Sequence, residues 1–99
     1  MADADSLWIG RERHRHDIID APEIGHTAKC DAEIEIGLAA RDRLSELLAD
    51  GFDVRTTGAK GRYGRTLSTW WLPDGREAGE VLLDEGLAVV WPQRRDWCR

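Results

Sequence analysis

The chain has 99 residues, which leaves room for one domain, since most domains contain about 100–200 residues. Hydrophobic residues make up 41% and charged residues 33% of the sequence, which is typical of a globular protein and excludes a disordered one. No apolar run approaches the roughly 18 residues that a membrane-spanning helix needs. The N-terminus lacks a basic stretch followed by an apolar one, so we expect either an intracellular protein or a chain without its export segment.

The net charge is −5, from 14 basic and 19 acidic residues, which argues against a broad basic surface that coats nucleic acid nonspecifically. The charge is unevenly distributed along the chain. Residues 1–40 contain four basic and nine acidic residues, whereas residues 54–78 contain five basic and two acidic ones. This asymmetry suits a bound cation beside a site for an anion, although inert proteins show it as well.

The first half of the chain is predicted to contain strands followed by one long helix. Residues 7–9 are a short apolar piece that ends at Gly10, and residues 11–19 favour a strand with one wet or ligand-binding face. Pro22 ends this strand because it has no N–H for a ladder hydrogen bond. Apolar residues at helical spacing predict a helix over residues 31–50.

The second half is predicted to contain two strands, a short helix and a last strand. The strands cover residues 52–57 and 62–72 and are joined by a turn over 58–61, the short helix covers 79–85, and the last strand covers 87–91. About five short strands and one main helix favour an α+β fold in which a helix closes a small β-barrel.

The tail and the two cysteines leave two interpretations open. We expect one domain over residues 1–92 and a polar C-terminal tail over residues 93–99. Cys30 and Cys98 are not a zinc site, because the sequence has no CxxC pair. They are either two free thiols or a disulfide that ties the tail to the middle of the chain, and a disulfide would imply an oxidising compartment.

Three carboxylates near the N-terminus are candidates for a metal site. Asp5, Asp20 and Glu23 lie in predicted loops or at strand ends, and the last two flank Pro22 in a rigid turn. Clusters of carboxylate oxygens bind Ca²⁺ or Mg²⁺. The other interpretation is that these residues are simply solvated.

Two arginines are candidates for a phosphate site. Arg15 lies five residues before Asp20, and Arg65 lies in the basic middle of the chain. Two arginines that converge on carboxylates and a metal would bind a phosphate and offset the charge of a phosphoryl transition state. The other interpretation is a pair of surface arginines.

Histidines and tryptophans suggest further sites. His14 and His16 share one face of a predicted strand and, with His26 or Cys30 nearby, would suit a transition metal. Their alternation with arginines favours a solvated strand face instead. Trp70 and Trp71 point to opposite faces of their strand, so we expect one in the core and regard the other as a candidate stacking platform for bases.

Four segments occur in an order that matches a known family. Residues 3–10 read DADSLWIG, residues 15–23 read RHDIIDAPE, residues 60–67 read KGRYGRTL and residues 82–88 read LLDEGLA. The first segment is similar to an Asp-Gly-Asp-Thr turn. The second is similar to a signature in which an arginine is followed at a fixed distance by the consecutive residues Asp, either Thr or Ala, Pro and Glu. The third resembles a Tyr-Gly-Arg strand, and the fourth a closing helix with Gly-Leu-Ala. Together they resemble the staphylococcal nuclease (thermonuclease) family.

The resemblance implies a five-stranded OB-fold barrel with one main helix and a second short helix. It also implies a Ca²⁺-dependent nuclease that hydrolyses phosphodiester bonds in DNA or RNA by metal-assisted attack of water. The cofactor would be one calcium ion and the partner a single-stranded DNA or RNA substrate. The roles implied for individual residues are calcium binding by Asp5, Asp20 and the carbonyl of Ala21, catalysis by Arg15, Glu23 and Arg65, and substrate contact by Arg62, Tyr63 and Leu67.

The chain also departs from the family pattern. It starts at the aspartate turn, so we expect most of the first strand to be absent and the barrel edge to be open or completed by another chain. Ala4 replaces a glycine, His16 and Asp17 replace apolar residues, and Gly61 stands where an acid is usual. Family members are often secreted or periplasmic, whereas this chain shows no export signal. The missing first strand, the acidic net charge and Gly61 favour the alternative, a catalytically inactive module of the same fold that binds nucleic acid or a protein partner. The complete set of Arg15, Asp20, Glu23 and Arg65 opposes it.

Overall fold

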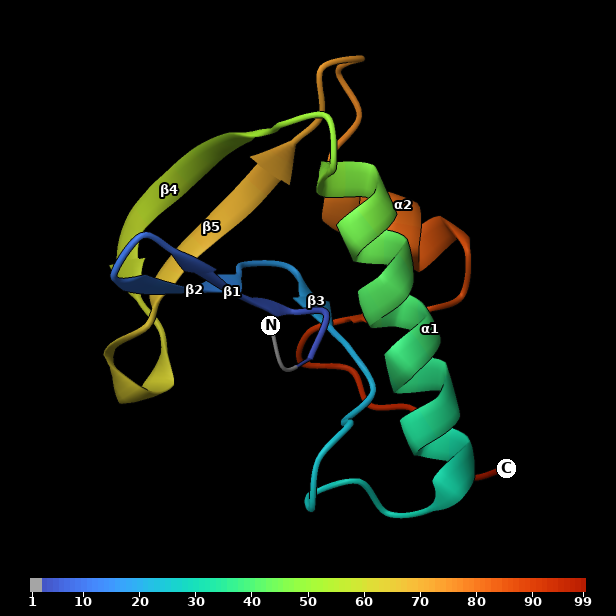
Figure 1. The fold of residues 1–99 in the computed structure, drawn as a ribbon. Helices are drawn as coiled ribbons and strands as arrows, with labels where there is room; N and C mark the ends of the chain where they lie inside the picture. The colour runs from blue at the N-terminus through green and yellow to red at the C-terminus, as the bar shows by residue number, and fades with distance from the viewer. Residues whose placement is uncertain (1–2) are drawn as a thin grey trace.

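The computed structural model describes residues 3–99, apart from the side chain of Arg62. Within this part of the chain, six strands and two α-helices form a mixed α+β fold (Figure 1), which confirms the predicted class. In chain order the elements are β1 (Ser6–Ile9), β2 (Glu12–His16), β3 (Ile19–Asp20), α1 (Asp31–Leu48), β4 (Asp53–Lys60), the 3-10 helix η1 (Arg62–Gly64), β5 (Thr66–Trp71), α2 (Ala78–Asp84) and β6 (Val89–Val90).

The strands form two separate sheets. The larger sheet has the order β1-β2-β5-β4, in which β2 and β5 are parallel and the other pairs are antiparallel. The smaller sheet pairs β3 with β6. The described strands therefore do not close into the single five-stranded barrel that the resemblance implied. No described helix is long and apolar enough to cross a membrane.

A bend after His16 separates the two sheets. Residues 11–19 were expected to form one strand, but Nδ1 of His16 accepts hydrogen bonds from the N–H groups of Ile18 at 3.0 Å and of Ile19 at 3.2 Å. These bonds replace ladder bonds and turn the chain between β2 and β3. Arg15 consequently stays in the larger sheet, where it is paired with Leu67, while Asp20 joins the smaller sheet.

The helix α1 covers the core, as its periodicity predicts. Ala40, Leu44 and Leu47 are buried on its inner face, in one cluster with Ile19 and Trp70. In Figure 1 the two helices lie side by side, and α2 also contacts β5 of the larger sheet. Burial of Trp70 confirms that one of the two adjacent tryptophans belongs to the core.

The segment before β5 is not a strand. It was expected to join the strand over 62–72, but β4 continues to Lys60 and the next residues form η1. Tyr63 has a φ of 67° and is the only described non-glycine residue with a positive φ. Ala4 is fully buried and has no positive φ, so the glycine usual at its position is not required here.

The histidines of β2 are buried, so the prediction of a solvated strand face is wrong. His14 and His16 are 5% and 1% exposed. The Nδ1 atom of His14 lies 2.9 Å from Ser68 Oγ, and its Nε2 lies 2.8 Å from Glu12 Oε1. Burial is possible because neighbouring side chains satisfy the ring nitrogens.

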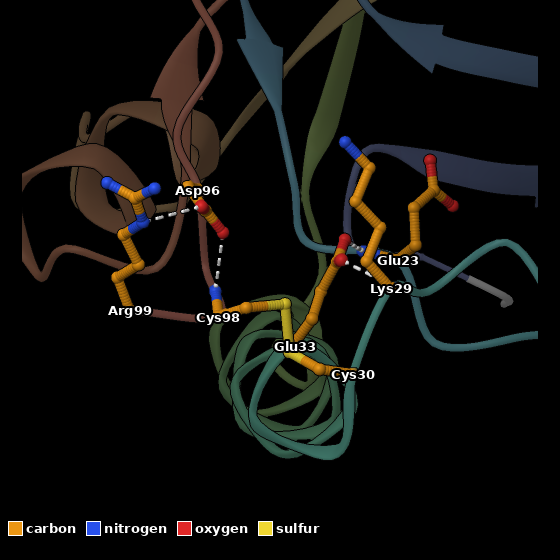
Figure 2. Close-up of a disulfide and its surroundings, with 7 residues drawn as sticks. All are labelled: Glu23, Lys29, Cys30, Glu33, Asp96, Cys98 and Arg99. Atoms are coloured by element: carbon orange, nitrogen blue, oxygen red, sulfur yellow. Dashed lines mark hydrogen bonds and ion pairs between the residues drawn. A yellow bond between two sulfur atoms is a disulfide. The ribbon is translucent and has the colours of Figure 1, made fainter.

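The C-terminal tail is attached to the start of α1. Of the two interpretations of the cysteines, the structure contains the disulfide, which joins Cys30 to Cys98 across 68 residues of sequence (Figure 2). Trp97 is 9% exposed and packs with the guanidinium of Arg95 over its ring. The tail is therefore part of the folded structure.

Candidate active site

Two of the expected calcium ligands, Asp5 and Asp20, lie in contact. Asp5 is 6% exposed, and its Oδ2 accepts a hydrogen bond of 2.9 Å from the N–H of Ala21. Its Oδ1 accepts from Ser6 Oγ at 3.2 Å. Burial, together with the charge of Asp5 and a hydrogen bond to it, raises the pKa of Asp20 above its ordinary value. The fold therefore holds two carboxyl groups from distant segments at one place.

The third carboxylate, Glu23, lies in the turn that follows β3. A hydrogen bond to Asp3, burial, and the charges of Asp3 and Asp5 raise the pKa of Glu23 to about 8. Thr27 Oγ1 donates to Glu23 Oε2 at 3.2 Å. Burial and the neighbouring carboxyl groups thus raise the pKa of both Asp20 and Glu23, and the charge of a bound cation would oppose this effect.

A carboxylate on α1 fixes the backbone of this turn. Glu33 Oε2 accepts from the N–H of Glu23 at 2.9 Å, and Oε1 accepts from the N–H of Lys29 at 3.0 Å. Asp3 Oδ1 accepts from the N–H of Ile24 at 3.0 Å. Sequence reasoning missed Asp3 and Glu33, although both are acidic residues next to predicted turns.

Arg15 spans the bend between the two sheets. Its Nη1 donates to the carbonyl oxygens of His16 at 2.9 Å and Ile19 at 2.8 Å. Its Nη2 lies 3.5 Å from Asp20 Oδ1 and 4.0 Å from Asp5 Oδ2. The guanidinium is thereby held beside the acidic pair.

The expected site residues are distributed over two neighbouring cavities. One cavity, of about 240 Å³, is lined by Asp20, Ala21 and Glu23 among others. The other, of about 420 Å³, is lined by residues that include Arg15, Tyr63, Arg65, Leu67 and Trp91. Asp20 and Glu23 thus face the smaller cavity and Arg15 and Arg65 the larger one, whereas Asp5 lines neither. The Arg15–Asp20 contact connects the two sides.

Ser6 links the second arginine to the acidic pair. Arg65 Nη1 donates to Ser6 Oγ at 3.3 Å, and Ser6 in turn donates to Asp5. Tyr63 is 85% exposed at the rim of the larger cavity. The side chain of Arg62, also expected to contact substrate, lies outside the described part of the chain.

A buried polar network supports the site from beneath. Because Nδ1 of His16 accepts two backbone hydrogen bonds, its Nε2 carries the proton and donates to Glu77 Oε2 at 2.9 Å. Glu77 also accepts from the N–H groups of Trp70 at 2.8 Å and Glu80 at 3.0 Å. Burial opposes the ionisation of Glu77, but these hydrogen bonds outweigh it and lower its pKa.

The donor set fits a hard divalent cation. Within the described part of the chain, no group of three or more His, Cys, Asp or Glu side chains is arranged to hold a metal. The calcium site that the resemblance implies needs only two such side chains, Asp5 and Asp20, because its third ligand is the backbone carbonyl of Ala21. Oxygen donors of this kind suit Ca²⁺, which takes 6–8 oxygen ligands and accepts water among them.

Comparison with known proteins identifies the family. A search of curated proteins found no match. The family model described as staphylococcal nuclease homologue matches residues 15–98. This range contains Arg15, Asp20, Glu23 and Arg65, whereas Asp5 precedes it. Since the match covers most of the chain, the chain belongs to the staphylococcal nuclease homologue family.

Proposed function

We propose that this member of a nuclease family is a calcium-dependent enzyme that hydrolyses phosphodiester bonds in single-stranded DNA or RNA. The observation that carries the proposal is the contact of Arg15 with an acidic pair, since its Nη2 lies 3.5 Å from Asp20 and 4.0 Å from Asp5. A module that only bound nucleic acid would gain from the arginine but not from adjacent carboxylates, which repel phosphate. Catalysis with a cation uses both.

The carboxylates supply the metal and water side of the reaction. Asp5, Asp20 and the carbonyl of Ala21 would hold calcium, which when bound polarises the phosphate and lowers the pKa of water. Glu23 would accept a proton from the attacking water or orient it once the charge of a bound cation opposes the effects that raise its pKa to about 8. Its backbone hydrogen bond to Glu33 fixes the position from which it acts.

The cationic side binds the phosphate. Arg15 and Arg65 donate hydrogen bonds to the phosphate oxygens and stabilise the charge that builds up in the transition state. Tyr63 and Leu67, which line the larger cavity with both arginines, contact the nucleotide, and Arg62 lines its approach.

Substitutions on each side of the site test the proposal. Glu23→Ala and Arg65→Ala should each lower the rate of calcium-dependent hydrolysis of a single-stranded oligonucleotide by about 10²–10³-fold, because each removes a positioned charge. Circular dichroism should show unchanged folding. The matched controls are Glu35→Ala and Arg41→Ala on α1, since Glu35 is exposed and Arg41 pairs with its neighbour Asp42 and lines neither cavity. Full activity in both site variants would contradict the assignment and favour the inactive binding module.

A further inference from the structure

We infer that Arg94, in the C-terminal tail, is a further phosphate-binding residue of this site, and that the Cys30–Cys98 disulfide holds it there. The inference rests on the proposed function, because the phosphate would belong to the nucleic acid substrate. Arg94 lines both cavities, the one with Asp20 and Glu23 and the one with Arg15 and Arg65. It therefore stands where a strand that occupies both cavities would pass.

The charge of Arg94 already reaches the acidic pair. Its positive charge, like that of Arg15, opposes the rise in the pKa of Asp20 that burial and Asp5 cause. Arg94 is exposed and forms no hydrogen bond or salt bridge within the described part of the chain. Because Arg94 lines the cavity of Asp20 and Glu23 as well as that of Arg15 and Arg65, its guanidinium is available to bind an anion at the site.

The other arginines of the tail are engaged elsewhere. The guanidinium of Arg95 lies over the ring of Trp97 at 4.9 Å, and Arg95 lines only the smaller cavity. Arg99 pairs with Asp96 at 3.2 Å and lines neither cavity. Arg99 therefore provides a control with the same loss of charge in the same tail.

Anchors on both sides of Arg94 fix its backbone. Before it, the N–H of Trp91 donates to the Ile18 carbonyl at 2.7 Å, and the N–H of Gln93 donates to the Val90 carbonyl at 2.8 Å. After it, Cys98 is bonded to the residue that precedes α1.

Figure 2 shows the disulfide beside Glu33, the residue that also holds the backbone of Glu23. One short region thus attaches both the tail and the catalytic turn to α1. Without the disulfide, the segment that carries Arg94 loses its second anchor.

Salt-dependent binding tests the inference without relying on hydrolysis. The dissociation constant for a labelled single-stranded oligodeoxynucleotide is measured with calcium in a Glu23→Gln background. Arg94→Ala should weaken binding about tenfold and reduce the slope of log affinity against log salt by about 0.7, the value for one phosphate contact on a single strand. Arg94→Lys should restore the slope, and Arg99→Ala should leave it unchanged. Equal slopes for Arg94→Ala and Arg99→Ala, or no binding by the parent protein, would overturn the inference.

Removal of the disulfide tests how Arg94 is held. The variant Cys30→Ser/Cys98→Ser, shown to be folded by circular dichroism, should reproduce the loss caused by Arg94→Ala, and adding Arg94→Ala to it should have little further effect. Full binding by the folded disulfide-free variant would contradict this part. If these binding results are obtained but the protein with Glu23 does not hydrolyse the oligonucleotide, the proposed function fails while Arg94 remains a phosphate-binding residue.

Discussion

At the scale of single residues, the buried pair of His16 and Glu77 determines where the site residues lie. The ring of His16 packs edge-on against Trp70, with centroids 4.9 Å apart, and both of its nitrogens are hydrogen-bonded. Its Nδ1 holds the bend that sends Arg15 and Asp20 into different sheets. Loss of either partner would leave buried polar groups unpaired, which is more costly than the loss of an exposed pair.

Glu77→Gln should lower the free energy of unfolding by about 3 kcal/mol at pH 7, because an amide cannot accept all the hydrogen bonds of the carboxylate. Since the pKa of Glu77 is lowered in the folded state, its ionisation stabilises the fold above the ordinary pKa of 4.5 and this stabilisation is lost as the pH falls through the lower folded-state value. Urea unfolding should therefore show the difference from the parent protein shrinking below pH 4.5. A difference that is constant with pH, or as small as that of the exposed Glu35→Gln control, would contradict this account.

At the scale of elements, α1 approaches the turn that carries Glu23 closely enough to fix its position. A Cβ at Gly37 would lie 2.9 Å from the Ile24 side chain, 3.1 Å from the Pro22 carbonyl oxygen and 3.2 Å from that of Glu23. Two of these neighbours are backbone atoms of the turn, so they cannot move without moving Glu23. The absence of a side chain at Gly37 therefore allows Glu33 to reach the same turn.

Gly37→Ala should lower the rate of hydrolysis by about tenfold or more, because displacement of Glu23 misaligns the groups that act on water. The variant should also lose about 1–3 kcal/mol of stability through overpacking, an effect opposed by the higher helix propensity of alanine. Gly25→Ala is the matched control, since a Cβ there meets nothing within 4 Å and Gly25 has no positive φ. Initial rates and urea unfolding of both variants check this, and a fully active Gly37→Ala would contradict it.

At the scale of the whole molecule, the fold brings together segments of opposite charge that are separate in the sequence. The acidic N-terminal segment and the basic middle meet where Arg65 donates to Ser6 and Arg15 lies beside Asp20. A chain with a net charge of −5 thus still contains a local group of cations, because Arg15, Arg65 and Arg94 all line the larger cavity. The disulfide brings in the tail from the far end of the sequence.

Local patterns predict much of this fold, and long-range contacts account for the rest. Helical spacing correctly predicts α1, and Pro22 correctly predicts that the strand containing Asp20 ends before the segment that carries Glu23. The bend in residues 11–19 depends on Nδ1 of His16, whose ring is held by Glu77, 61 residues away. No local pattern contains that contact, so a continuous strand was expected. The attachment of the C-terminal tail to the start of α1 similarly involves a disulfide that the sequence left open.

The most direct test of the central claim is the hydrolysis of single-stranded DNA and RNA by the purified protein, with calcium and with a chelator. We expect cleavage with calcium and its loss on chelation, restored by added calcium, because the crowded carboxylates of Asp5 and Asp20 need a cation before a phosphate can approach. No cleavage by folded protein in the presence of calcium, or equal cleavage with the chelator, would contradict the account.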